Sequence, residues 1–179
     1  MKLIAEQSVF VKKKYAWGII LLGSLLSACG YRFAGGGSLP SGVTSVSVEM
    51  FQNRTGETGV ETIITNDLIY EFNRHEQVVV TGSDKADAIL TGVIQSISER
   101  TISHTGEYTS DERRVVLNLD LQLTHKSGGV IWSAKGLSEN EAYKVMPGKS
   151  STERSKRIAI QRLSKRLSEN IFNRLTADF

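Results

Sequence analysis

Residues 115–124 read Val-Val-Leu-Asn-Leu-Asp-Leu-Gln-Leu-Thr, and this stretch decides the fold because its polarity alternates with a period of two. Such alternation predicts a β-strand with one buried face and one solvated face. Residues 126–129, Lys-Ser-Gly-Gly, predict a hairpin turn, since glycine readily adopts the positive φ angles that such turns require. The alternation resumes at Val130, so we expect a partner strand that can run on to Tyr143.

The segments before this hairpin predict further strands. Residues 43–51 alternate between apolar and polar side chains, which indicates a strand with one buried face. Residues 86–98 are apolar on both faces, which favours a central strand, and a short apolar run at 78–80 precedes them. Residues 100–111 are rich in hydroxyl groups and lack an apolar period, so we expect an exposed loop or an extension of the hairpin there.

Two segments have the periodicity of amphipathic helices. Apolar residues recur at spacings of three and four over 60–72 and again over 160–175. Capping boxes at 58–61 and 150–153 would open the two helices. The order of elements predicts an α+β fold with two helices packed on one face of a roughly four-stranded mixed sheet. The first helix could act as a right-handed crossover that makes its flanking strands parallel.

The first 28 residues predict a lipoprotein signal peptide. Three lysines at 12–14 precede a mostly apolar run at 15–26, which is too short for a comfortable membrane-spanning helix. The sequence Leu-Ser-Ala-Cys that ends at Cys29 resembles the lipobox of bacterial lipoproteins, in which the chain is cut before the cysteine and the cysteine is acylated. We therefore predict lipidation of Cys29 and attachment of the mature chain to a membrane. The alternative is an ordinary signal peptide with an unrelated cysteine.

Cleavage before Cys29 would determine several properties of the mature chain. Its glycine-rich segment 29–42 predicts a lipidated tether, and 43–179 predicts a single domain. The sole cysteine carries lipid, so no disulfide is expected. Removal of the signal peptide leaves 18 basic and 18 acidic side chains, which disfavours a nucleic-acid partner. Gly30 follows the cysteine, where aspartate favours inner-membrane retention in the lipoproteins it resembles, so we expect the periplasmic side of the outer membrane.

No motif predicts catalysis, a cofactor or a metal site. The three histidines are scattered over loops and element ends. His75 and Glu76 begin like a zinc-protease motif, but Val79 occupies the place of the second histidine. A nucleophile elbow of the Gly-x-Ser-x-Gly type is also missing. We therefore expect a protein that is not an enzyme.

Four basic residues are the candidate binding site. Arg113 and Arg114 open the leucine-rich strand, and Lys144 and Lys149 flank the loop after its partner strand. Together they predict a cationic mouth at one end of the sheet that pairs with phosphates through charge-assisted hydrogen bonds. For any one of them alone, a solvated strand end or helix surface is the favoured interpretation.

Several short motifs resemble the LPS-assembly lipoprotein family, LptE. They are Cys29-Gly-Tyr-Arg-Phe33, Leu39-Pro40, Phe51-x-Asn53-x-Thr55, Gly59-Val-Glu61 and Ala86-Asp-Ala-Ile-Leu-Thr-Gly92. The resemblance implies a protein anchored by lipid in the outer membrane, which plugs the LptD β-barrel and binds lipopolysaccharide on its way to the cell surface. We expect the four basic residues to pair with the phosphates of lipid A. The alternative is an envelope scaffold lipoprotein that binds peptidoglycan or another periplasmic protein.

Overall fold

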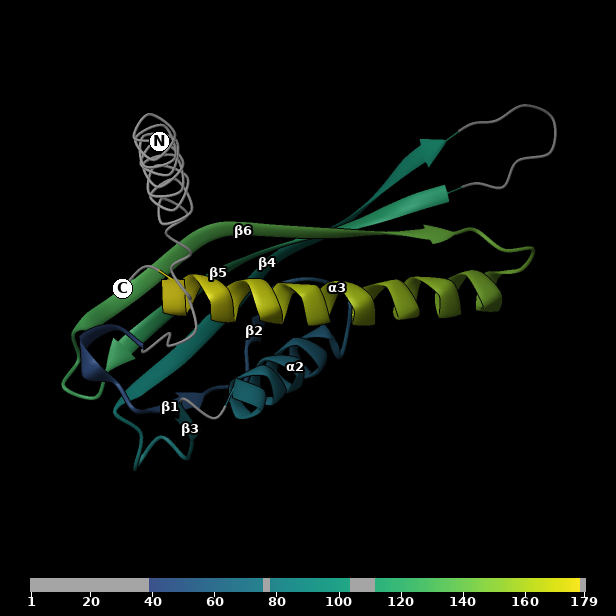
Figure 1. Cartoon of the computed structure of the whole chain (residues 1–179). Coiled ribbons are helices and arrows are strands. Elements are labelled where there is room, and N and C mark those ends of the chain that lie inside the picture. The colour runs from purple at the N-terminus through teal and green to yellow at the C-terminus, as the bar shows by residue number, and fades with distance from the viewer. Residues whose placement is uncertain (1–38, 76–77, 104–111, 178–179) are drawn as a thin grey trace, which may run out of the picture. The chain divides into compact units, whose positions relative to one another are not determined.

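The computed structural model describes residues 39–75, 78–103 and 112–177. The signal peptide, Cys29 and the tether up to residue 38 lie outside the described residues. Figure 1 shows the arrangement of the elements. In chain order they are η1 (Pro40–Gly42), β1 (Ser45–Val48), β2 (Gln52–Asn53), α2 (Val60–His75), β3 (Val79–Val80), β4 (Ala88–Ser103), β5 (Glu112–His125), β6 (Val130–Lys144) and α3 (Lys149–Ala177).

The strands form one mixed sheet, which confirms the predicted fold class. Its order is β3-β1-β4-β5-β6, with β2 paired beside β4. The strands β1 and β2 run parallel to β4, whereas β4, β5 and β6 are joined as antiparallel neighbours. The sheet has six strands, whereas the sequence predicts about four. The prediction missed β2 and β3, because each is only two residues long and has no detectable period. The crossover through α2 does make β1 parallel to β4.

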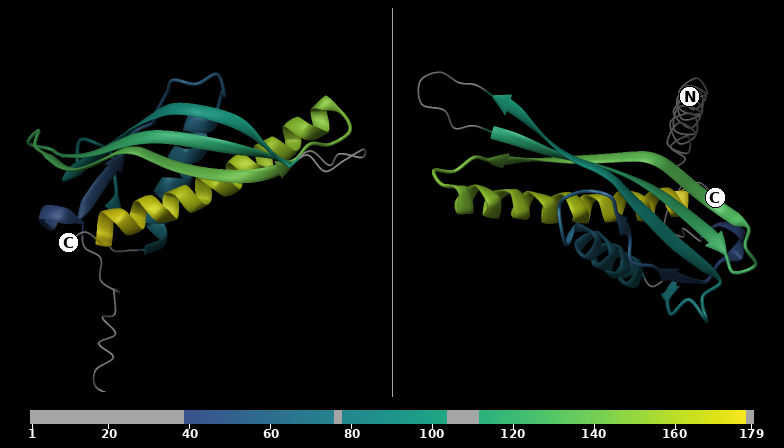
Figure 2. Two further views of the ribbon diagram at one scale, coloured as in Figure 1. Left: turned by 90° about the horizontal axis from the view of Figure 1, so that it is seen from above. Right: turned by 180° about the vertical axis from the view of Figure 1, so that it is seen from behind.

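Both helices pack on the same face of the sheet. Their apolar stripes join the inward side chains of the strands in one buried cluster. The leucines that alternate along β5 all point into it, as the sequence predicts. The helix α3 runs along β6, and α2 lies beside α3 over the shorter strands (Figure 2). The largest side chains with almost no exposure are Phe51, Phe72, Leu39, Ile64, Leu68, Leu90, Ile94, Leu117, Leu119, Leu123, Leu163 and Leu167.

A β-bulge in β4 changes which side chains face the helices. Ile94 pairs with Leu119 and Ser96 pairs with Asn118, so Gln95 is an extra residue in the strand. Before the bulge the even-numbered residues are buried, whereas after it Ile97 packs against the core. The bulge therefore turns the odd-numbered residues toward the helices and leaves Arg100 on the open face of the sheet. The sequence pattern of 86–98 does not predict this change.

Three details differ from the sequence predictions. Residues 39–42, assigned to the tether, include the turn η1, and Leu39 is buried in the core. The capping boxes are wrong in their partners, because the Glu61 carboxylate accepts the Gly59 N–H at 3.1 Å. At α3 the hydroxyl of Thr152 bonds back to the preceding loop in place of the predicted cap. The predicted extension of the hairpin is confirmed for 100–103, which continue β4, and 104–111 lies outside the described residues.

Candidate functional site

The four predicted basic residues lie at one end of the sheet but not on one face. Arg114 and Lys144 flank buried residues of β5 and β6 and therefore lie on the open face, away from the helices. Arg113 lies on the face covered by the helices, where its guanidinium is 3.8 Å from Glu99. Lys149 begins α3 and is exposed. The structure thus brings Arg114 and Lys144 together and separates Arg113 from them.

Arg100, which the sequence pattern does not indicate, joins Arg114 and Lys144 on the open face; these three residues form the open-face cluster. Arg100 pairs directly across the strands with Arg114. Side chains in such a pair have Cβ atoms roughly 5 Å apart, and like charges placed there destabilise the sheet. Neither arginine forms an ion pair with any other residue that the structure describes. Two adjacent guanidinium groups facing solvent are suited to binding an oxyanion bidentately.

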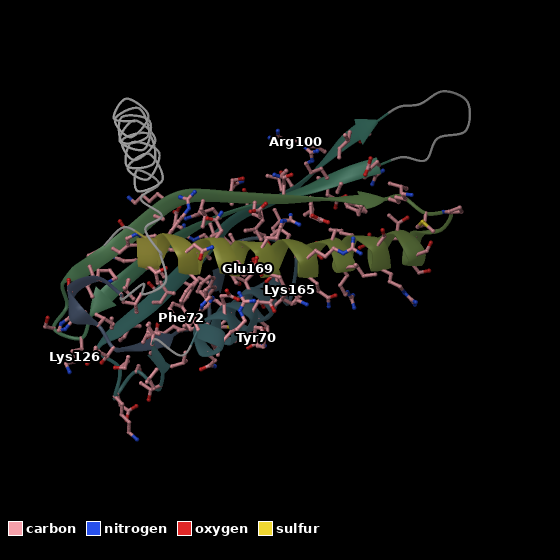
Figure 3. All side chains as sticks on the ribbon, viewed as in Figure 1. Tyr70, Phe72, Arg100, Lys126, Lys165 and Glu169 are labelled. Carbon is pink, nitrogen blue, oxygen red and sulfur yellow. The ribbon has the colours of Figure 1, made fainter. Side chains whose placement is uncertain are left out.

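The surroundings of this arginine pair are mixed in polarity. Lys144 lies opposite Glu112 and diagonally from Arg114 on the same face. Two large apolar side chains are exposed at this end of the sheet, Ile102 in β4 and Met146 in the loop before α3, at 42% and 45%. Figure 3 places Arg100 at the end of the sheet opposite Lys126. The end therefore presents cations beside exposed apolar groups.

On the helix-covered face, Glu99 is the centre of a polar network. It accepts a hydrogen bond from the Tyr143 hydroxyl and lies 2.9 Å from the Lys156 amine. Lys156 also donates to Glu57 at 2.6 Å and is largely buried. The network joins α3 to β4, β6 and the loop before α2. Arg113 belongs to this network and not to the open-face cluster, because its nearest carboxylate is Glu99.

The network shifts the ionisation of its members. The hydrogen bond from Tyr143, with smaller contributions from Lys156 and Arg113, holds the pKa of Glu99 below its ordinary value. Burial and the bond to Glu99 raise the pKa of Tyr143 to about 12. Burial disfavours the charged Lys156, but the two carboxylates outweigh it and raise the pKa of the amine. At neutral pH Glu99 and Lys156 are therefore charged and Tyr143 is neutral, and their contacts join the first turns of α3 to the sheet.

The described histidines have structural partners. His75 lies 2.9 Å from Glu71 and stacks on Phe172 at a centroid distance of 4.0 Å. His125 bonds to Ser127 in the hairpin turn. Among residues 39–75, 78–103 and 112–177, no group of three or more His, Cys, Asp or Glu side chains could hold a metal ion. Within the same residues, no helix is long and apolar enough to cross a membrane. His104 lies outside the described residues.

Several solved structures share this fold, a mixed sheet with two helices on one face, and those named here are bacterial lipoproteins. Lipoprotein B from Nitrosomonas europaea aligns with a TM-score of 0.56 at 16% identity, over 79% of this chain and 86% of that one. A minor lipoprotein from Acinetobacter baumannii gives 0.53 at 13%, over 75% and 92%. The rare lipoprotein B from Shewanella oneidensis gives 0.51 at 11%, over 75% and 95%. At such identities the likeness concerns the fold.

The sequence itself defines the family. The family model for LptE, described as lipopolysaccharide-assembly, matches residues 43–175, which is nearly the whole described domain. The chain therefore belongs to the LptE family, and its role lies in lipopolysaccharide assembly. No curated protein is similar enough to match the chain.

Proposed function

We propose that this protein is an outer-membrane lipoprotein that plugs an LptD-like β-barrel, assists its assembly and binds lipopolysaccharide in transit. The observation that carries the binding proposal is the cross-strand pair of Arg100 and Arg114 on the open face. Two like charges held side by side cost stability, and a bound phosphate would offset that cost. Family membership supplies the process in which such a phosphate-bearing ligand occurs.

The ligand that fits this end of the sheet is an amphiphile. Lipid A combines phosphates with acyl chains, and the end of the sheet combines Arg100, Arg114 and Lys144 with exposed Ile102 and Met146. Cations would pair with the phosphates, and the apolar side chains would contact the beginning of the acyl chains. Lys149 lies across the short loop from Lys144 and can extend the cationic surface. In this proposal Arg113 belongs to the polar network around Glu99 and does not contact the phosphates itself.

The open face of the sheet supports the plug proposal. Several of its central polar side chains are satisfied within the sheet, since Gln95 donates to Asp120 at 2.7 Å and Asp120 accepts the Gly136 N–H at 2.7 Å. Asn118 donates to Ser96 at 2.9 Å in the same way. A face of this kind loses little on contact with the polar, water-filled lumen of a large barrel. Acylation of Cys29 would keep the domain at the periplasmic side of the outer membrane.

One set of variants tests lipopolysaccharide binding. Replacement of Arg100, Arg114, Lys144 and Lys149 by alanine should weaken binding of purified lipopolysaccharide at least tenfold and leave the melting temperature within a few degrees. Each charge-assisted bond lost costs on the order of 1.5 kcal/mol or more, and 1.4 kcal/mol corresponds to a factor of ten. A matched variant that removes four other exposed cations, Arg54, Lys85, Lys135 and Arg174, should bind normally. Equal loss in both variants would show that only net charge matters.

Purification from detergent-solubilised membranes tests the plug. A stoichiometric, heat-modifiable barrel should accompany the tagged protein. Retention of peptidoglycan or of another periplasmic protein without a barrel would favour the envelope scaffold predicted as the alternative. Mass spectrometry of the mature N-terminus should find Cys29 acylated, and an unmodified terminus would refute the anchor.

A further inference from the structure

Strand β6 forms a long outer edge of the sheet (Figure 1). It has 15 residues, pairs with β5 on one side and stands last in the strand order. A long edge strand presents unpaired backbone groups that can pair with another chain, so proteins usually cover or interrupt such an edge. The two halves of β6 differ in how far they are protected.

The second half of β6 is covered by α3. The guanidinium of Arg166 donates to the carbonyl of Asn140 at 2.5 Å and forms an ion pair with Glu141. Arg162, one turn earlier in the helix, pairs with the same glutamate. These contacts occupy an outward carbonyl and hold the helix against the edge. A further strand is therefore excluded from this half.

The first half of β6 is open along its backbone. Among the residues that the structure describes, none outside β5 bonds to the backbone of 131–138. The carbonyl of Gln122 accepts the Thr91 hydroxyl at 3.4 Å and thus faces β4, so its partner Ser133 faces away from β5. The same alternation turns the backbone of Ser138 outward, two residues before the carbonyl bound by α3. Both serines therefore present a backbone N–H and C=O to an incoming strand.

A β-bulge interrupts this open edge but does not cover it. Lys135 and Gly136 together lie opposite Asp120, so β6 has one extra residue there. Gly136 has a φ of 65°, and its N–H donates to the Asp120 carboxylate at 2.7 Å. The bulge thus satisfies its own donor. It leaves the outward groups of Ser133 and Ser138 on either side of it.

A hollow of about 540 Å³ lies between this edge and the last turns of α3. It is lined by residues 132–138 and by Arg174. Trp132 and Leu137 lie on the helix-covered face, since both pair with buried leucines of β5. The indole of Trp132 packs against the core but is only partly buried. A strand added beside β6 would place alternate side chains in this hollow, next to the indole.

The charged side chains among the described residues that line the hollow are both cations, Lys135 and Arg174. Lys135 lies near Asp120, whose carboxylate partly balances it. Arg174 is exposed and forms no ion pair with any residue that the structure describes. Its Nε donates to Asn170 at 3.0 Å, which leaves the two terminal nitrogens for a carboxylate. The hollow is therefore complementary to a negative charge.

We propose that the first half of β6 binds an extended, acidic segment of another protein as an additional strand of the sheet. The backbone of this segment would pair with Ser133 and Ser138. On the side that faces α3, a carboxylate would pair with Arg174, and an apolar residue two positions away would contact Trp132. This inference does not rest on the proposed plug function.

The open edge favours this partner over a lipid and over a second copy of the chain. Backbone donors and acceptors along one strand match the main chain of another extended peptide, which a lipid does not have. A second copy would add its own β6, and an antiparallel pair of these edges would bring Lys135 and Arg174 close to the same cations of the copy. Such like-charge contacts disfavour self-association.

Proline substitutions test the direction of the backbone groups in the purified protein. Ser133→Pro removes an N–H that points away from β5, and edge strands tolerate proline at such positions, so the melting temperature should fall by only a few degrees. Ala134→Pro removes an N–H that faces β5 and should lower the melting temperature far more. Equal losses at the two positions would refute an open edge at Ser133.

Photo-cross-linking tests the added strand in intact bacterial cells. Benzoylphenylalanine at Ser138 of the full chain should cross-link to a protein segment that has a carboxylate two positions from an apolar residue. Ser133→Pro or Arg174→Glu should reduce the yield at least tenfold, whereas Ser133→Ala and the control reversal Lys85→Glu should change it less than twofold. Replacement of the segment's acid by arginine should restore the yield with Arg174→Glu.

Several results would overturn the proposal. Cross-links only to lipid, or to another copy of this chain, would give the edge a different occupant. A captured segment without a carboxylate would remove the role of Arg174. A yield that survives Ser133→Pro would show that the backbone of β6 is not used, and an equal loss with Ser133→Ala would assign the contact to the hydroxyl group.

Discussion

The aromatic ring of Phe51 occupies the space directly over Gly92. A Cβ atom built at position 92 would lie 2.7 Å from Cδ2 and Cε2 of the ring, closer than such atoms approach in proteins. Phe51 is itself almost fully buried, so the ring cannot withdraw into solvent. Both residues belong to the motifs that carry the family resemblance. Their role is thus to close the core where the chain passes from β1 to β2 alongside β4.

The variant Gly92→Ala should lower the free energy of unfolding by about 1–3 kcal/mol, the usual cost of overpacking a rigid core. Urea denaturation measures this directly. Gly129→Ala is the matched control, because nothing lies within 4 Å of a Cβ at that turn position. Its stability should stay within about 0.5 kcal/mol of the wild type. Equal effects at the two sites would contradict the close contact.

The buried backbone N–H of Phe51 donates to the hydroxyl of Thr65 at 3.2 Å. Thr65→Val keeps the shape of the side chain but leaves this donor without a partner, so we expect a loss of about 1–2 kcal/mol of stability. Thr62→Val, at an exposed position of the same helix, makes the same chemical change without affecting a buried bond. A comparable loss at Thr62 would mean that helix propensity, and not the hydrogen bond, is responsible.

The raised pKa of Tyr143, about 12, makes stability depend on alkaline pH. An unfolded tyrosine ionises near pH 10, so from about pH 10 to 12 the unfolded state releases a proton that the folded state retains. Stability contributed by this group is present below pH 10 and is lost as pH rises through 12. Tyr143→Phe should be less stable at pH 7 by about 1 kcal/mol and should lose less stability than the wild type between pH 9 and 11. Parallel pH profiles of urea midpoints for the two proteins would refute the coupling.

The repulsion between Arg100 and Arg114 should lower the stability of the free protein, whereas the same pair should strengthen the binding of lipopolysaccharide. Arg100→Gln removes the like-charge contact with Arg114, so it should stabilise the free protein by about 0.2–1 kcal/mol at low salt. The gain should disappear near 1 M salt, where the screening length falls to about 3 Å. The same variant should bind lipopolysaccharide more weakly. Stabilisation that persists at high salt would show that packing, and not charge, is the cause.

Arg113 and Arg114 are adjacent in sequence and should differ in function. Arg114→Ala should weaken lipopolysaccharide binding about three- to tenfold with little change in melting temperature, because its side chain is exposed on the open face. Arg113→Ala should change the affinity less than twofold but lower the stability, since it removes a cation near Glu99. Isothermal titration and thermal melts of both variants distinguish the two roles. Reversed effects would place the binding surface on the helix side.

The parts of the fold that the sequence predicts are those with a long, uninterrupted period. The leucine alternation of β5 and the helix stripes that include Ile64 and Leu167 extend over many residues, so burial decides their state. The two-residue strands β2 and β3 have no period. β2 forms because the chain continues alongside β4 after β1, and β3 forms because the chain returns beside β1 after α2. The family motif around Asn53 reads as a loop, although its amide bonds Glu57 and Glu61 and organises the start of α2.

The candidate site was predictable in position but not in composition. Basic residues at strand ends indicate which end of the sheet carries the exposed cations, as Arg114 and Lys144 show. Arg113 and Arg114 lie on opposite faces because successive side chains of a strand alternate, so their separation follows from the sequence pattern of β5. The contribution of Arg100 could not, because it depends on a strand register set by the bulge at Gln95. Pairing across strands is a tertiary property that a local pattern does not contain.

The extra residue at position 95 has an evolutionary corollary. In a relative that lacks it, the equivalents of Ile94 and Ser96 would be consecutive and would still lie opposite those of Leu119 and Asn118. The equivalents of Glu99 and Arg100 would therefore keep their faces, but each would lie one position closer to Gly92 in the sequence. Alignments anchored at Gly92 that ignore this single insertion would compare inward residues with outward ones over the rest of the hairpin. Deletion of Gln95 should thus leave Arg100 opposite Arg114 and remove the bend in the strand, because only the unpaired residue is lost.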